Sequence, residues 1–349
     1  MGKRNTSEFK TALTTLTDRL TAFLTGKISS NTLGYDTNWG GVIASLGKGS
    51  ESLDNGNAFY FNHHIQYGYL LFAAAVVARY TPSFLTANKS VLYLLARDIV
   101  NPSSKDSSFP RWRHKDWYTG RSYSSGLSSI TTLGKDASNV AEAVNGYLGA
   151  YYLGLAFNDK LLITTAQVLL ATEVRSAKTY YQYSVERMVD IIPPFDQVLT
   201  VNSWQDLQYK YGLNVNCNPN VFPQRHACIL ATIVRPFSPV SNDLIQPAWV
   251  FNVQNNLYQA LMDTDNGSLY DGWRAYAWMT LSLLPNSGTA AWDAIEQLDP
   301  TQMVPGNTLT NSLFWTLADI EDNNESSSSE EEIGIDMVII EEPKYHRRH

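Results

Sequence analysis

The sequence predicts a mostly helical, single-domain protein, and three observations indicate this class. Stretches with apolar residues at helical spacing recur along most of the chain. Long loops rich in glycine, serine and aromatic residues separate these stretches. The hydrophobic content of 44% and the charged content of 17% are typical of a globular chain with a sizeable core. This alternation fits an α/α toroid, in which paired helices form two rings and the loops build a cleft.

Five helices are expected in the N-terminal half. Apolar residues at helical spacing predict an amphipathic helix over 9–24. Residues 67–80 are apolar nearly all round, which predicts a helix buried between neighbours. Further helices are expected over 84–100, 139–157 and 160–183, and small residues within 139–157 permit close packing.

Two stretches, 34–56 and 101–129, have the composition of long loops. Long loops inside compact domains are usually functional. A pair of short strands is expected around 188–201. The remaining helices are predicted over 247–262, 272–284 and 288–297.

The charge is unevenly distributed. Residues 321–349 hold nine acidic and three basic residues, so they carry −6 of the total charge of −7. The nearly neutral remainder lacks the basic face that binds nucleic acid, and it suits a neutral substrate such as a sugar polymer. No run approaches the ~20 apolar residues that a membrane-spanning helix needs.

The N-terminus is charged but is not followed by the apolar segment of a secretory signal. The protein is therefore expected to be intracellular, in the cytoplasm or the nucleus. Cys217 and Cys228 have no companions at metal-ligand spacing, and in such a compartment they are expected to be free thiols. No metal or other cofactor is expected.

The composition predicts a domain over residues 1–320 and an acidic tail over 321–349. Residues 321–332 are of low complexity and too polar to bury, so they are expected to be disordered. Residues 333–342 form a short β-prone run flanked by acids, which resembles a SUMO-interacting motif. Such a segment can bind a protein partner by adding a strand to its sheet. The alternative is a solubilising tail that folds back onto the domain.

Six segments, in order, resemble one known family. The most specific are NAFYFNHHIQYGY (57–69), FPRWRHKDWYTGRSYSSGL (109–127) and GKDASNVAEAVNGY (134–147). The others are 172–181, 235–240 and 306–315. Over about residues 35–318 the chain thus resembles the catalytic domain of glycoside hydrolase family 81, the endo-β-1,3-glucanases.

The resemblance implies an all-α (α/α)6 barrel that cleaves β-1,3-glucan internally with inversion of the anomeric centre. The family usually carries an N-terminal β-sandwich before the barrel. Because the match begins within the first 40 residues, this sequence is expected to have no room for that sandwich.

The resemblance also implies three positions for the catalytic carboxyl groups. An inverting glycosidase needs an acid that protonates the leaving oxygen and a base that activates water, about 6.5–9.5 Å apart. The general acid falls on Asn62, a second glutamate on Ser138, and the general base on Glu142. A carboxamide cannot deliver a proton to a leaving alcohol, so one carboxylate of three remains. The spacing of Asn139 and Glu142 is also typical of a capping box at a helix start, and both roles are compatible.

The matching segments imply a set of substrate-binding positions. Gln66 and Arg121 stand where the family has histidine, and Tyr123 stands where it has tryptophan. Asp116 or the His63–His64 pair are the alternative proton donors, although the histidines suit the shaping of the cleft wall better. The implied substrate-binding positions are His63, His64, Asp116, Trp117, Tyr118, Arg121, Tyr123, Asn145 and Tyr147.

Three functions remain open at this point. The first is a pseudoenzyme that keeps a cleft for β-1,3-glucan or a related polysaccharide, or serves as a scaffold. The second is a working endo-β-1,3-glucanase with a rearranged acid. The third is an interaction protein that uses the barrel surface and the acidic tail. Asn62 and Ser138 disfavour the second, and the aromatic residues in the loops favour the first over the third.

Overall fold

The computed structural model describes residues 6–27, 31–127, 139–180, 182, 230, 234–262, 271–303 and 306–325. Several predictions fall outside the described residues. These are the strands around 188–201, Cys217, Cys228, Ser138, and the segment 333–342 of the acidic tail.

The five helices expected in the N-terminal half are confirmed. They are α1 (Ser7–Leu24), α2 (His63–Tyr80), α3 (Pro82–Ile99), α4 (Val140–Phe157) and α5 (Lys160–Tyr180). Helix α2 begins four residues before the expected 67, because it includes the polar His63, His64 and Gln66 that the apolar run omits. No described helix is long and apolar enough to cross a membrane.

The C-terminal half adds α9 (Ser241–Leu244), α10 (Pro247–Met262), α11 (Asp271–Leu281), α12 (Gly288–Glu296) and α13 (Leu309–Glu325). Helix α13 corrects the predicted start of the disordered tail, because it runs through residues 321–325. Leu313 and Trp315 pack against the core and anchor this helix. Extending an anchored helix adds one hydrogen bond for each residue that is fixed, which favours continuation into the acidic segment.

The stretch 34–56 is not a structureless loop. Strands β1 (Leu33–Asp36) and β2 (Gly41–Ala44) form an antiparallel hairpin with Leu33 opposite Ala44. Three short 3-10 turns follow at Leu46–Gly49, Glu51–Leu53 and Asn57–Phe59. Strands of four residues are too short for alternation to distinguish them from a loop, which is why the sequence did not predict them.

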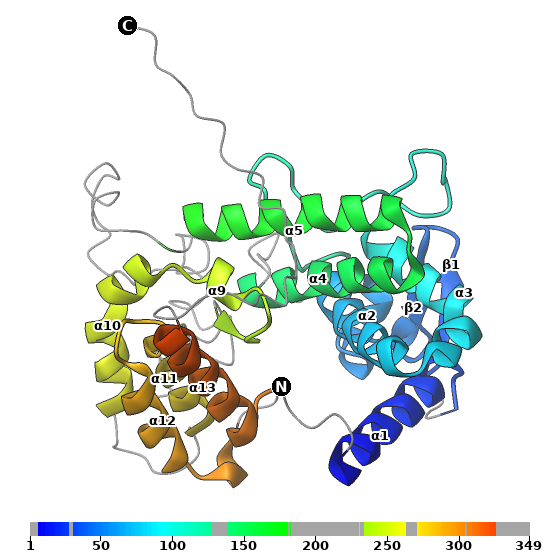
Figure 1. Ribbon diagram of the computed structural model, residues 1–349. Coiled ribbons are helices and arrows are strands. Elements are labelled where there is room, and N and C mark those ends of the chain that lie inside the picture. The colour runs from blue at the N-terminus through cyan, green and yellow to red at the C-terminus, as the bar shows by residue number, and fades with distance from the viewer. Residues whose placement is uncertain are drawn as a thin grey trace, which may run out of the picture.

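Helices α4 and α5 lie across the middle of the molecule (Figure 1). Helices α1 to α3 and the hairpin lie at one end of this pair, and α9 to α13 lie at the other (Figure 1). One hydrophobic core connects both groups: Leu71 of α2, Leu148 of α4 and Tyr276 of α11 are all at most 1% exposed. The fold class is therefore all-α, as predicted.

Glycines bring the backbones of α2 and α4 into contact. A Cβ atom at Gly146 would lie 2.2 Å from the carbonyl oxygen of His64, and one at Gly149 would lie 2.3 Å from that of Gly68. The contacts advance in the same direction along both helices. The N-terminal ends of α2 and α4, which carry Asn62 and Glu142, therefore lie at the same end of the helix pair.

Replacing Gly146 by Ala is expected to lower the free energy of unfolding by roughly 1–3 kcal/mol, because the new methyl group meets backbone that cannot rotate away. Urea denaturation measures the loss. Gly49→Ala is the matched control, because a Cβ atom at Gly49 meets nothing within 4 Å. Equal stability of the Gly146 and Gly49 variants would contradict the close packing.

Candidate active site

Asn62 occupies the N-cap of α2 in the left-handed conformation, with φ of 55°. Its N–H donates to the Ser124 carbonyl at 2.9 Å, and its own carbonyl accepts from Ile65 and Gln66 at 2.9 and 2.8 Å. Its side-chain Oδ1 is buried and makes no hydrogen bond within the described part of the chain. The backbone thus fixes the position of Asn62 without using its side chain.

Glu142 lies in the first turn of α4, where its N–H donates to Asn139 Oδ1 at 3.2 Å. This is one half of the capping box. Among the described residues, the carboxylate contacts Tyr69 and Arg235: Tyr69 Oη donates to Oε1 at 3.4 Å, and Arg235 Nη2 lies 3.8 Å from the same oxygen. Burial raises the pKa of Glu142, while Arg235 and Tyr69 act in the opposite direction.

Replacing Glu142 by Gln is expected to raise the Tm at pH 7. A folded-state pKa above the unfolded value means that Glu142 favours the folded state while it is protonated, and this stability is lost as the pH rises through the folded pKa. Gln stays neutral throughout. Thermal melts from pH 7 downward should therefore show the two proteins converging as the pH falls below the ordinary glutamate value of 4.5. A lower Tm for Glu142→Gln at pH 7 would contradict this expectation.

The His63 ring is fully buried and held on both sides. Its Nδ1 lies 2.5 Å from Asp98 Oδ2, and its Nε2 lies 2.7 Å from the Asn57 carbonyl oxygen. Asp98 also accepts hydrogen bonds from the Val42 N–H and from Arg113. His63 therefore ties the start of α2 to α3 and to the hairpin, and both of its ring nitrogens are already used.

His64 is buried against a second histidine that the sequence did not single out. Its ring centroid lies 4.3 Å from that of His114. Burial lowers the pKa of His64, and burial together with the proximity of His63 lowers the pKa of His114 to about 3. His114 Nδ1 pairs with the Tyr123 carbonyl at 2.8 Å. Two neutral buried rings of this kind cannot release a proton near neutral pH.

Asp116 organises its own loop. Its carboxylate accepts from the Tyr118 N–H at 2.9 Å and from Thr119 Oγ1 at 2.8 Å. Burial raises its pKa, but these hydrogen bonds outweigh burial and lower it overall. Asp116 is therefore ionised near neutral pH.

A buried ion pair fastens the loop 101–127 to the helices behind it. Lys115 Nζ lies 2.7 Å from Glu173 Oε2 of α5, and the Lys115 side chain is fully buried. Glu173 also accepts from the Ser122 N–H at 3.0 Å. The Ser122 hydroxyl lies 2.7 Å from the Tyr147 hydroxyl of α4. Tyr147 is 0% exposed, so it supports the loop and offers no face to a ligand.

The remaining predicted binding residues divide by exposure. Trp117 and Tyr118 are 44% and 96% exposed, and Trp117 packs edge-on against Trp112 with ring centroids 4.8 Å apart. Arg121 and Asn145 are buried, and Arg121 Nη2 donates to Tyr123 Oη at 3.2 Å. Trp117 and Tyr118 are therefore the predicted aromatic residues that present rings to solvent.

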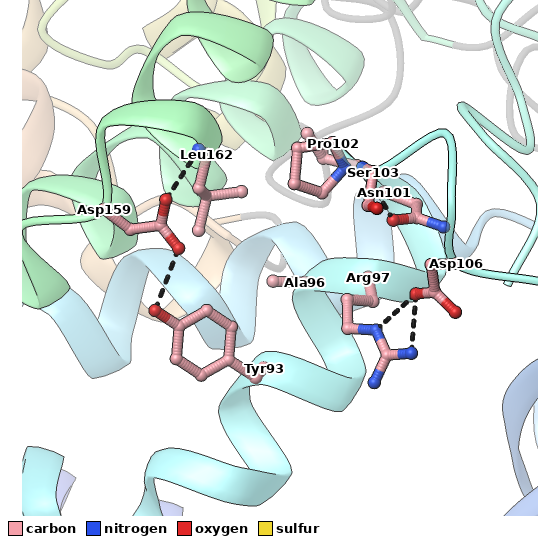
Figure 2. A pocket seen from close by; sticks show the side chains of 10 residues that line it. Tyr93, Ala96, Arg97, Asn101, Pro102, Ser103, Asp106, Asp159 and Leu162 are labelled. Atoms are coloured by element: carbon pink, nitrogen blue, oxygen red, sulfur yellow. Dashed lines mark hydrogen bonds and ion pairs between the residues drawn. The ribbon is translucent and has the colours of Figure 1, made fainter. Parts of the chain in front are cut away.

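A separate hollow lies between the end of α3 and the start of α5 (Figure 2). Arg97 pairs with Asp106 at 2.6 Å on one side of it. On the other side, Tyr93 Oη donates to Asp159 Oδ2 at 3.0 Å, and burial with this bond raises the pKa of Tyr93 to about 12. Figure 2 shows these polar groups paired with one another. They do not include any residue of the candidate active site.

The sequence does not indicate three of the residues that lie around Glu142. Tyr69 lies within an apolar helix and has the pattern of a core residue. Arg235 lies in a matched segment but 93 positions after Glu142. Tyr276 lies in α11, and its hydroxyl interacts electrostatically with both Arg235 and Glu142. No local pattern indicates that such distant residues meet.

The chain matches the model of the glycosyl hydrolase family 81 C-terminal domain over residues 3–317. The primary septum glucan endo-1,3-β-D-glucosidase of Schizosaccharomyces pombe is 28% identical over 257 residues, which are 72% of this chain and 24% of that protein. The glucan endo-1,3-β-D-glucosidase of Glycine max is 26% identical over 304 residues, 86% of this chain and 43% of that protein. The chain spans less than half the length of these relatives.

A solved glycoside hydrolase family 81 structure from Clostridium thermocellum has the same fold. Its TM-score is 0.62 at 20% identity, and the match covers 91% of this chain and 41% of that one. This likeness confirms the predicted all-α toroid. With most of its length matched by the family model, the chain belongs to glycoside hydrolase family 81.

Proposed function

We propose that this family 81 domain binds β-1,3-glucan or a related polysaccharide but is impaired in its hydrolysis. The observation that carries the proposal is the amide of Asn62 at the start of α2, at the same end of the helix pair as Glu142. Glu142 suits a general base, since burial raises its pKa. A base alone does not protonate the leaving oxygen, and general acid catalysis contributes typically ~10²–10⁴-fold.

The alternative proton donors are poorly suited to this step. His63 is enclosed by Asp98 and the Asn57 carbonyl, and His64 is buried with a lowered pKa. Asp116 has a lowered pKa, and its carboxylate oxygens accept hydrogen bonds from Tyr118 and Thr119 in its own turn. These observations favour the impaired domain over a working enzyme with a rearranged acid.

Retained binding rests on the exposed aromatic rings. Trp117 and Tyr118 lie in the loop that the Lys115–Glu173 pair fastens to the helices, so the loop is held while the rings face outward. Aromatic rings offer flat apolar faces to the C–H side of a pyranose. This favours a glucan-binding domain over a protein that uses its surface only as a scaffold.

Titration calorimetry with a soluble β-1,3-glucan tests the proposal. We expect the unaltered protein to bind, and Trp117→Ala or Tyr118→Ala to weaken binding about tenfold, a loss of about 1.4 kcal/mol. Phe314→Ala is the control, because Phe314 is also exposed, at 62%, but lies on α13. If the unaltered, folded protein does not bind the glucan, the proposed binding is wrong. A role as a scaffold would then be the reading that fits.

A further inference from the structure

The Glu142 carboxylate is contacted from two parts of the fold that lie far apart in the sequence. Tyr69 reaches it from α2 at 3.4 Å, and Arg235 reaches it from the segment before α9 at 3.8 Å. Both contacts are made to the same oxygen, Oε1. The side chains of Glu142 and Arg235 are 19% and 23% exposed, so water screens their attraction only in part.

Arg235 also contacts an aromatic ring that lies far from Glu142 in the sequence. Its guanidinium carbon lies 5.7 Å from the ring centroid of Trp273, within the range of a cation–π interaction. Trp273 is buried in α11. Tyr276 follows it on the same helix, and its buried hydroxyl makes no hydrogen bond within the described residues. The guanidinium is thus presented to the carboxylate from the wall formed by α11.

We propose that Arg235 is the positioning residue of Glu142: anchored on Trp273, it holds the carboxylate toward Tyr69 and keeps it charged. The proposal rests on the proposed function only in assigning Glu142 to the base position. It also connects the two groups of helices of Figure 1, since Tyr69 belongs to α2 and Trp273 to α11. Without this cation, a buried carboxylate takes up a proton and cannot activate water.

The test follows the titration of Glu142 by ¹³C NMR in protein labelled at the glutamate carboxyl carbons. The Glu142 resonance is assigned by its loss in Glu142→Gln. Within the part of the chain that the structure describes, the titratable and charged groups that face this carboxylate are Arg235, Tyr69 and Tyr276. Of these, Arg235 alone is a cation, so Arg235→Gln should move the titration midpoint of Glu142 upward. Arg235→Lys keeps a cation and should return the midpoint most of the way to its value in the unaltered protein.

Arg97→Gln is the matched control, because Arg97 pairs with Asp106 at the separate hollow of Figure 2 and should leave the midpoint unchanged. If Arg235→Gln does not fold, the unaltered protein provides the second measurement. Raising the salt from about 0.01 M to about 1 M shortens the screening length from ~30 Å to ~3 Å and should move the midpoint upward.

An unchanged Glu142 midpoint in folded Arg235→Gln would overturn the proposal and leave Arg235 as a packing residue on Trp273. An unchanged midpoint across the salt range would do the same in the unaltered protein. The titration needs neither hydrolysis nor glucan binding. A wrong assignment of Arg235 is therefore distinguishable from a wrong proposed function, which the calorimetry detects.

Discussion

If position 62 is the general-acid position, as proposed, replacing Asn62 by Asp is expected to raise hydrolysis of a soluble β-1,3-glucan by ~10²–10⁴-fold over the unaltered chain, because it supplies a carboxyl group that can protonate the leaving oxygen. The backbone tolerates the change. Asn62 has φ of 55°, and Asp adopts this left-handed conformation about as readily as Asn. The N–H bond to Ser124 and the carbonyl bonds to Ile65 and Gln66 are main-chain bonds that remain.

Adding Ser138→Glu to Asn62→Asp should raise the rate further, because the resemblance to the family implies a second glutamate at position 138. Reducing-sugar release measures both variants, and Asn62→Ala serves as the control. The Ala variant lacks any proton donor at this position and should match the unaltered chain. If the double variant is no faster than Asn62→Ala, the missing general acid is not what limits the rate of glucan hydrolysis by this protein.

Replacing Glu173 by Ala is expected to lower the free energy of unfolding by about 3–5 kcal/mol, because it leaves the buried ammonium group of Lys115 without its anionic partner. The Lys115 side chain is fully buried and lies 2.7 Å from Glu173. Burial lowers the pKa of Lys115, and Glu173 is the main group that opposes this effect. The Ser122 N–H also loses its acceptor.

Urea denaturation measures this loss, with two comparisons. Glu296→Ala, an exposed change on α12, should stay within about 0.5 kcal/mol of the unaltered protein. Lys115→Met combined with Glu173→Leu removes both charges and should recover much of the loss. If the double variant is as unstable as Glu173→Ala, the stranded charge is not the cause.

Most of the helices could be predicted because apolar residues recur at helical spacing within each of these segments. The hairpin at β1 and β2 could not, since four residues per strand are too few to show alternation. Helix α13 was missed for a different reason. Its last turns are acidic, and their helical state depends on the anchoring of the preceding turns in the core.

The candidate site could be predicted only in part. Asn62 and Glu142 are found from their segments, but the contact that brings them to one end of α2 and α4 depends on Gly68 and Gly146 meeting across two helices. A sequence shows that small residues permit close packing, not which helix they meet. The approach of Arg235 to Glu142 is likewise a tertiary contact, with no local sign in either segment.

The most direct test of the central claim is the initial rate of reducing-sugar release from soluble β-1,3-glucan by the unaltered protein. The sample is first shown to be folded and to bind the glucan. With an amide at position 62, the expected rate is no higher than that of Asn62→Ala. Turnover of the order of 1–10³ s⁻¹, the ordinary range for enzymes, would contradict the proposed impairment of hydrolysis.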